Sequence, residues 1–66
     1  MQPKYPDIHV TLVGEDGNAF NILGRVNQAL RKNGVLAEER HAFWQEATSG
    51  DYDHLLQTCM AWVEVE

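Results

Sequence analysis

The spacing of the apolar residues constrains the fold of this chain more than any other feature of its sequence. Ile8, Val10 and Leu12 alternate with His9 and Thr11, which is the spacing of a β-strand with one buried face. Further along, apolar residues recur every three or four positions, as they do in α-helices, and the last four residues alternate again. We therefore expect a strand over 8–13, then three helices, and a short C-terminal strand.

The first helix is expected to span about 15 residues, and residues typical of helix ends lie on both sides of it. Asn18 can accept a hydrogen bond from the first turn, so we expect it to cap the N-terminus. Gly34 suits the left-handed conformation that commonly ends a helix, with Val35 packing beside it. Gly24 lies mid-helix, where we expect it to let a neighbouring element approach closely. The apolar face is expected to contain Ala19, Phe20, Ile22, Leu23, Val26, Ala29 and Leu30.

Two shorter helices follow. The second is expected roughly over 36–48, with Glu38 and Glu39 in its first turn, where carboxylates favour the helix dipole. Asp51 is placed to cap the third helix, after a turn at Gly50. The expected apolar positions are Leu36, Phe43, Trp44 and Ala47 in the second helix, and Tyr52, Leu55, Leu56, Cys59, Met60 and Val63 in the third.

The chain of 66 residues is too short for more than one domain. We expect a single small α+β domain over 1–66, in which residues 1–6 form an extended lead-in that holds both prolines. The two strands must pair to satisfy their backbone groups, and they form a two-stranded sheet packed on the helices. The spacing leaves the strand direction open. Such a sheet keeps unpaired edges, so a second copy of the chain is among the expected partners.

The charge of the chain is negative and unevenly distributed. The formal net charge is −5, with +1 in residues 1–33 and −6 in residues 34–66. Because acidic groups repel phosphate, we do not expect binding to nucleic acid or to an anionic membrane. The single cysteine excludes an internal disulfide, and neither a membrane span nor a signal peptide is visible. We therefore expect a cytoplasmic protein.

The densest polar segment is residues 48–54, before the third helix. Asp51 and Asp53 suit the first turn of a helix, which is a purely structural role. The same segment could also hold a small catalytic or ligand-binding site, in which Asp51, Asp53 and His54 converge. Because no complete catalytic set is present, we favour a surface that binds a protein partner. Its candidate residues are Ser49, Asp51, Tyr52, Asp53, His54 and the nearby Trp44.

Other combinations of reactive residues lack the spacing that their chemistry needs. The histidines and Cys59 include no short ligand pair of the kind zinc sites use, so we expect no metal and no cofactor. Cys59 lies on an apolar stripe, where we expect it to be buried and unreactive. A basic face of Arg25, Arg31 and Lys32 could contact nucleic acid or an acidic partner, although a solvated helix surface is the simpler interpretation.

Two segments resemble a group of small bacterial proteins without an established activity. These segments are Asp-Gly-Asn-Ala-Phe at 16–20 and Thr-Ser-Gly-Asp-Tyr-Asp-His-Leu-Leu at 48–56. The resemblance extends over about residues 8–65 and implies a bacterial or phage-related origin, but no activity, cofactor or site. The sequence as a whole predicts a small interaction or accessory protein rather than an enzyme.

Overall fold

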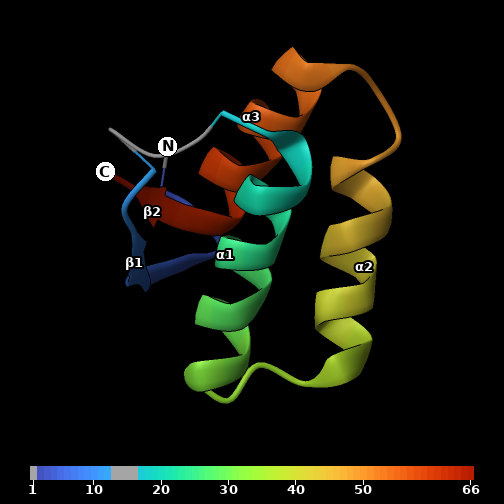
Figure 1. Cartoon of the computed structure of the whole chain (residues 1–66). Helices are drawn as coiled ribbons and strands as arrows, with labels where there is room; N and C mark the ends of the chain where they lie inside the picture. The colour runs from blue at the N-terminus through green and yellow to red at the C-terminus, as the bar shows by residue number, and fades with distance from the viewer. Residues whose placement is uncertain (1, 13–16) are drawn as a thin grey trace.

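The computed structural model describes residues 2–12 and 17–66. The elements are strand β1 (Tyr5–Val10), helices α1 (Ala19–Lys32), α2 (Ala37–Ala47) and α3 (Tyr52–Trp62), and strand β2 (Val63–Val65). Helices α1 and α3 contact the strands on one side and α2 on the other (Figure 1). The predicted α+β fold, with a two-stranded sheet packed on the helices, is confirmed.

The two strands run parallel. A parallel pair requires a long crossover, which the three helices between β1 and β2 provide. Near the end of the chain, the backbone N–H of Glu66 donates to Val10 O and that of Leu12 donates to Glu66 O, both at 2.8 Å. Val13, at the end of the predicted strand, and residues 14–16 lie outside the described residues.

Strand β1 begins at Tyr5, three residues earlier than the apolar alternation predicts. The end of the predicted lead-in therefore belongs to the sheet. Tyr5 pairs with Val63, and the N–H of Lys4 donates to Ala61 O at 2.9 Å. Pro6 has no N–H to donate, and the register of the pairing shifts in the stretch that contains it, as is usual for proline in an edge strand.

The core lies where α1, α3 and the strands meet, with α2 closing it from the other side. Leu30, Phe43 and Val63 are fully buried, and each belongs to a different element. Of the predicted inward positions of the first strand, Ile8 and Val10 are buried, whereas Leu12 lies beyond the end of β1 and is only partly buried. Most of those of α1 are confirmed. The buried apolar residues are Ile8, Val10, Ile22, Leu23, Val26, Leu30, Phe43, Ala47, Leu55, Cys59 and Val63.

Both ends of α1 and the start of α3 are built as the sequence predicts, while Val63, expected at the end of the third helix, begins β2. Asn18 accepts a hydrogen bond from the N–H of Phe20 at 2.9 Å, and Asp51 accepts one from the N–H of His54 at 2.9 Å. Gly34 has a φ of 82°, and the N–H of Val35 donates to the carbonyl of Leu30 at 3.0 Å. This pattern satisfies carbonyls at the end of α1 that have no partner within the helix.

Several helical residues predicted to be apolar contacts are exposed. Phe20 is 74% exposed and Leu36 is 70% exposed at the position before α2, while Tyr52 and Met60 of α3 are exposed by nearly half. Thr58 is buried instead. Its hydroxyl donates to the carbonyl of His54 at 2.9 Å, so burial leaves no unsatisfied polar group. Spacing alone did not separate these positions from the core.

Gly24 does not have the role that its place in α1 predicts. A Cβ atom at Gly24 would meet nothing within 4 Å, and the residue is exposed. Close approach of a neighbouring element therefore does not explain this glycine. Among the described residues, none of the helices has the length and apolar character that crossing a bilayer requires.

Candidate functional site

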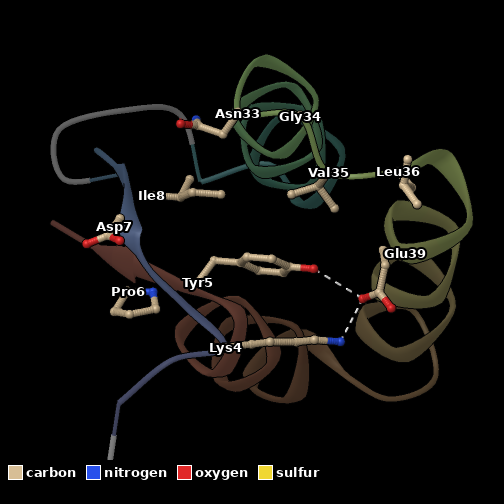
Figure 2. A pocket seen from close by; sticks show the side chains of 10 residues that line it. All are labelled: Lys4, Tyr5, Pro6, Asp7, Ile8, Asn33, Gly34, Val35, Leu36 and Glu39. Atoms are coloured by element: carbon tan, nitrogen blue, oxygen red, sulfur yellow. Dashed lines mark hydrogen bonds and ion pairs between the residues drawn. The ribbon is translucent and has the colours of Figure 1, made fainter.

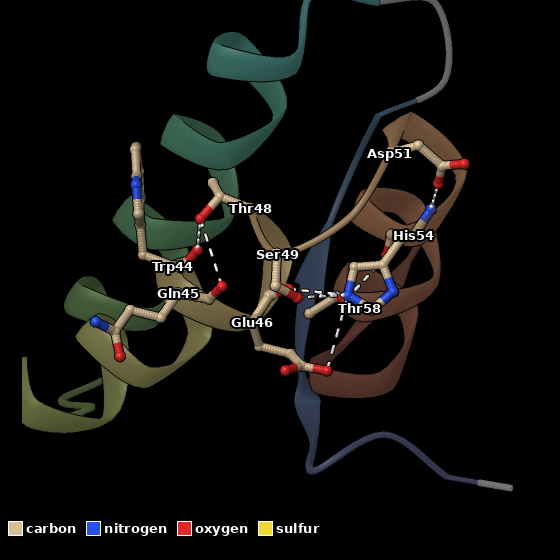
Figure 3. A network of polar contacts seen from close by, with 8 residues as sticks. All are labelled: Trp44, Gln45, Glu46, Thr48, Ser49, Asp51, His54 and Thr58. Atoms are coloured by element: carbon tan, nitrogen blue, oxygen red, sulfur yellow. Dashed lines mark hydrogen bonds and ion pairs between the residues drawn. The ribbon is translucent and has the colours of Figure 1, made fainter.

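Residues 48–51 connect α2 to α3, and residues 52–54 form the first turn of α3. The polar side chains of Thr48, Ser49, Asp51 and His54 turn back onto the ends of these helices (Figure 3). Ser49 Oγ donates to the carbonyl of Glu46 at 2.7 Å. His54 Nε2 is 2.9 Å from the same carbonyl and 3.1 Å from Ser49 Oγ. The structure therefore brings two predicted site residues, Ser49 and His54, onto one backbone oxygen at the end of α2.

The contacts at this oxygen determine which nitrogen of His54 carries a proton. A carbonyl oxygen can only accept hydrogen bonds, so the short contact to Glu46 O requires a proton on Nε2. The hydroxyl proton of Ser49 is also directed at that oxygen. Nε2 therefore cannot take the proton of Ser49, and the pair is not arranged as a nucleophile and its general base.

The two aspartates do not converge with the imidazole ring. Asp51 binds the backbone N–H of His54 as a helix cap, and Asp53 lies exposed in the first turn of α3. Among the described residues, no group of three or more His, Cys, Asp and Glu side chains could hold a metal ion. The contacts in this segment thus hold the turn between α2 and α3 together, which is the structural interpretation of the sequence.

Gly50 is required by the way that His54 packs. A Cβ atom at position 50 would lie 2.8 Å from both Cβ and Cγ of His54, closer than side chains tolerate. The imidazole therefore lies directly against the turn.

An apolar hollow of about 240 Å³ opens beside this turn, between the starts of α1 and α3. Leu23, Ala47 and Leu55, which belong to the core, form its walls. The aromatic rings of Phe20 and Tyr52 line it, although Phe20 is largely exposed and Tyr52 is exposed by nearly half. Tyr52 OH donates to the carbonyl of Gly17 at 2.6 Å, which fixes its ring at the edge of the hollow.

Trp44 lies apart from this hollow. It is 37% exposed and lines a separate groove between α1 and α2, together with Asn27 and Arg40. Trp62 is more covered, because its ring packs edge-on against Phe43 at a centroid distance of 5.5 Å. Trp44 is thus exposed as a binding residue would be, but the predicted surface does not form one continuous site.

Cys59 is fully buried, as its place on the apolar stripe predicts. Burial raises the pKa of its thiol to about 11, because the thiolate would lose its hydration. Since the nucleophile is the thiolate, Cys59 stays in its unreactive form at neutral pH.

The predicted basic residues do not form one face. Arg25 and Lys32 line a groove between α1 and β1 beside His9, but Arg31 is not among the described residues that line it. A carboxylate already faces this region, since Glu66 Oε1 is 2.9 Å from His9 Nδ1.

The structure also contains a charged and aromatic cluster that the sequence did not reveal. Lys4 Nζ donates to Glu39 Oε2 at 2.6 Å, and Tyr5 OH donates to the same oxygen at 3.2 Å (Figure 2). Lys4 Nζ also lies 4.4 Å from the centroid of the Trp62 ring. These residues come from the N-terminal segment, α2 and α3. Only the presence of aromatic and charged residues in the supposed lead-in could have drawn attention to them.

These contacts shift the pKa values of all three titratable groups in the cluster. The hydrogen bond with Glu39 raises the pKa of Lys4, and the same bond lowers the pKa of Glu39. Partial burial raises the pKa of Tyr5, and the neighbouring carboxylate of Glu39 adds to this effect. Lys4 and Glu39 are thus both held in their charged forms.

Comparisons of the chain with protein-family models, with curated proteins and with solved structures found no match. The resemblance to small bacterial proteins rests on the two sequence segments alone.

Proposed function

We propose that the chain is a small, non-enzymatic interaction protein of the cytoplasm, and that the hollow between Phe20 and Tyr52 receives an apolar side chain of a protein partner. The exposure of Phe20 carries this proposal. A phenylalanine exposed by 74% contributes little to the fold, yet it stands at an opening that leads directly to core side chains. Aromatic rings around a small apolar pocket are typical of the residues that dominate binding energy.

The charges near the hollow support a partner with basic residues beside its apolar anchor. Asp51 lines the hollow, and Asp53 lies exposed two residues further along α3. Opposite charges at the rim of an interface increase the rate of association and favour one orientation. This surface retains Tyr52, Asp51 and Asp53 from the sequence-based hypothesis and adds Phe20. It does not depend on His54 or Trp44.

The test is a tagged pull-down from a lysate of the source cells with three proteins: the unaltered chain, Phe20→Ser and Met60→Ser. Met60 is the matched control, because it is also an exposed apolar residue but does not line the hollow. We expect one stoichiometric protein with the unaltered chain and with Met60→Ser, and its loss with Phe20→Ser. Equal capture by Phe20→Ser would exclude this surface.

Treating half of the lysate with nuclease separates the alternatives. A partner that disappears after nuclease treatment would overturn the proposal in favour of nucleic-acid contact through Arg25 and Lys32. A second copy of the chain is the alternative partner, because each strand of the two-stranded sheet has an edge that the described residues leave without a paired strand. Sedimentation at high micromolar concentration distinguishes it: a dimer that persists in Phe20→Ser points to the strand edges rather than the hollow.

A further inference from the structure

We propose that Tyr5, Glu39 and Trp62 form a binding site for an alkylammonium group, and that the chain's own Lys4 occupies this site in the structure. The ammonium group of Lys4 has a carboxylate on one side and aromatic rings on the other. Its Nζ atom is 2.6 Å from Glu39 Oε2, 4.4 Å from the centroid of the Trp62 ring and 5.8 Å from that of Tyr5. This site is independent of the hollow at Phe20.

The combination of groups is specific for an organic cation. The face of an aromatic ring attracts a cation through its negative electrostatic potential, most strongly for tryptophan. The carboxylate supplies a charge-assisted hydrogen bond. Because Glu39 accepts this bond from the ammonium nitrogen, the preferred ligand has at least one N–H, as a lysine side chain does.

Other contacts hold the three groups in place independently of Lys4. Phe43, which is fully buried, packs against the Trp62 ring. Tyr5 is placed by its pairing with Val63, and its hydroxyl donates to Glu39 Oε2 at 3.2 Å. A ligand would therefore find a site that needs little rearrangement once Lys4 has left, which lowers the cost of binding.

The site is open to a ligand from outside the chain. The side chains of Lys4 and Glu39 are 50% and 42% exposed, so Lys4 can withdraw without opening the core. An open hollow of about 610 Å³ adjoins the site, between β1 and the connection from α1 to α2 (Figure 2). Val35 and the exposed Leu36 line it and offer apolar surface to the alkyl part of a ligand.

The test uses Lys4→Met, which keeps an unbranched side chain but removes the competing charge. The variant is titrated with n-butylammonium, and the indole N–H of Trp62 is followed by ¹⁵N NMR, with that of Trp44 as an internal reference. We expect a saturable shift of Trp62 in Lys4→Met, binding that is roughly two- to fivefold weaker in the unaltered chain, as the small free energy of an exposed ion pair implies, and no binding in Lys4→Met combined with Glu39→Gln. Tetramethylammonium, which has no N–H, controls for ionic strength and should bind at least fivefold more weakly.

The source of the ammonium group is distinguished by a second titration with Nα-acetyl-lysine amide. Tighter binding than n-butylammonium points to a lysine within a polypeptide, and equal or weaker binding points to a free amine; both results support the site. An unshifted Trp62 signal in folded Lys4→Met, or equal binding of the neutral 1-pentanol, would overturn it. If Lys4→Met does not fold, the unaltered chain is titrated with n-butylammonium in increasing excess. We then expect the signals of Trp62 and Lys4 to shift as the ligand displaces Lys4, and constant signals throughout the titration would reject the proposal.

Discussion

Helix α2 has a cluster of polar side chains at each end, and the two clusters are built differently. At its C-terminal end, Ser49 and His54 direct their polar atoms at the backbone carbonyl of Glu46. At its N-terminal end, Lys4 and Tyr5 bind the side chain of Glu39, 34 residues or more away in the sequence. Bonds to the backbone satisfy a helix end and fix a turn, whereas bonds between side chains leave a charged group at an open surface. The first arrangement serves the fold, and the second is available for binding.

The largest effect is expected at the C-terminal cluster, for Gly50→Ala. The new Cβ atom would lie 2.8 Å from His54, so either the imidazole or the turn must move. We expect a loss of about 1–3 kcal/mol in the free energy of unfolding, as is typical of overpacking. Urea unfolding followed by circular dichroism measures it.

Two further variants show whether the clash with His54 is the cause. In a His54→Gly background, Gly50→Ala should change stability by less than about 0.5 kcal/mol. A His54→Ala background should restore only part of the stability that Gly50→Ala loses, because the Cβ of residue 54 is itself among the clashing atoms. Gly24→Ala is the matched control, with free space around the new methyl group, and should stabilise α1 by about 1 kcal/mol. Equal losses at both glycines would break the interpretation of the turn.

Asp51→Ala tests the cap in the same cluster and should have a smaller effect. Removing the acceptor leaves the N–H of His54 without its partner at 2.9 Å, and losing such a cap costs about 1 kcal/mol. Asp51→Asn keeps a side-chain acceptor and should retain most of the stability. If Asp51→Ala leaves the free energy of unfolding unchanged but abolishes partner binding, Asp51 serves recognition rather than the fold.

The local features of the fold were predictable from sequence. Asn18, Gly34 and Asp51 act through neighbours within five residues, so the residue types at helix ends carry enough information to identify them. The same locality misleads about function. The polar density of residues 48–54 reflects the requirements of two adjoining helix ends, although Thr48, Gly50, Asp51 and Tyr52 of this segment also line the hollow.

What depends on distant residues could not be predicted. The parallel direction of the strands follows from how the helices pack, and the alternation of apolar residues is identical for both directions. The exposure of Phe20 depends on where α3 lies, since spacing alone places Phe20 at the margin of an apolar stripe. The cluster of Lys4, Glu39 and Trp62 requires β1 to begin inside a segment that its prolines marked as a lead-in.

At the N-terminal cluster, Lys4→Met should reduce stability less than Asp51→Ala does. The ion pair is exposed, and water already solvates both charges well, so removing it changes the free energy of unfolding little. The measurement is again urea unfolding, with amide NMR to verify that β1 still pairs with β2. A loss as large as that of Gly50→Ala would show that both clusters serve the fold, and the contrast between the ends of α2 would be wrong.

The smallest effect concerns the dependence of stability on pH. Since the hydrogen bond from Lys4 lowers the pKa of Glu39 below its ordinary value of 4.5, the unfolded chain binds more protons than the folded chain just below that value. The stabilisation from this carboxylate is therefore present above pH 4.5 and is lost as the pH falls through the lowered pKa. The difference in unfolding free energy between the unaltered chain and Glu39→Gln should narrow across this range.

Glu38→Gln, in the same helical turn but outside the cluster, controls for the change in net charge. If the unfolding free energies of the unaltered chain and Glu39→Gln instead change in parallel as the pH falls, Lys4 does not bind the Glu39 carboxylate in solution. That result would also count against the ammonium site.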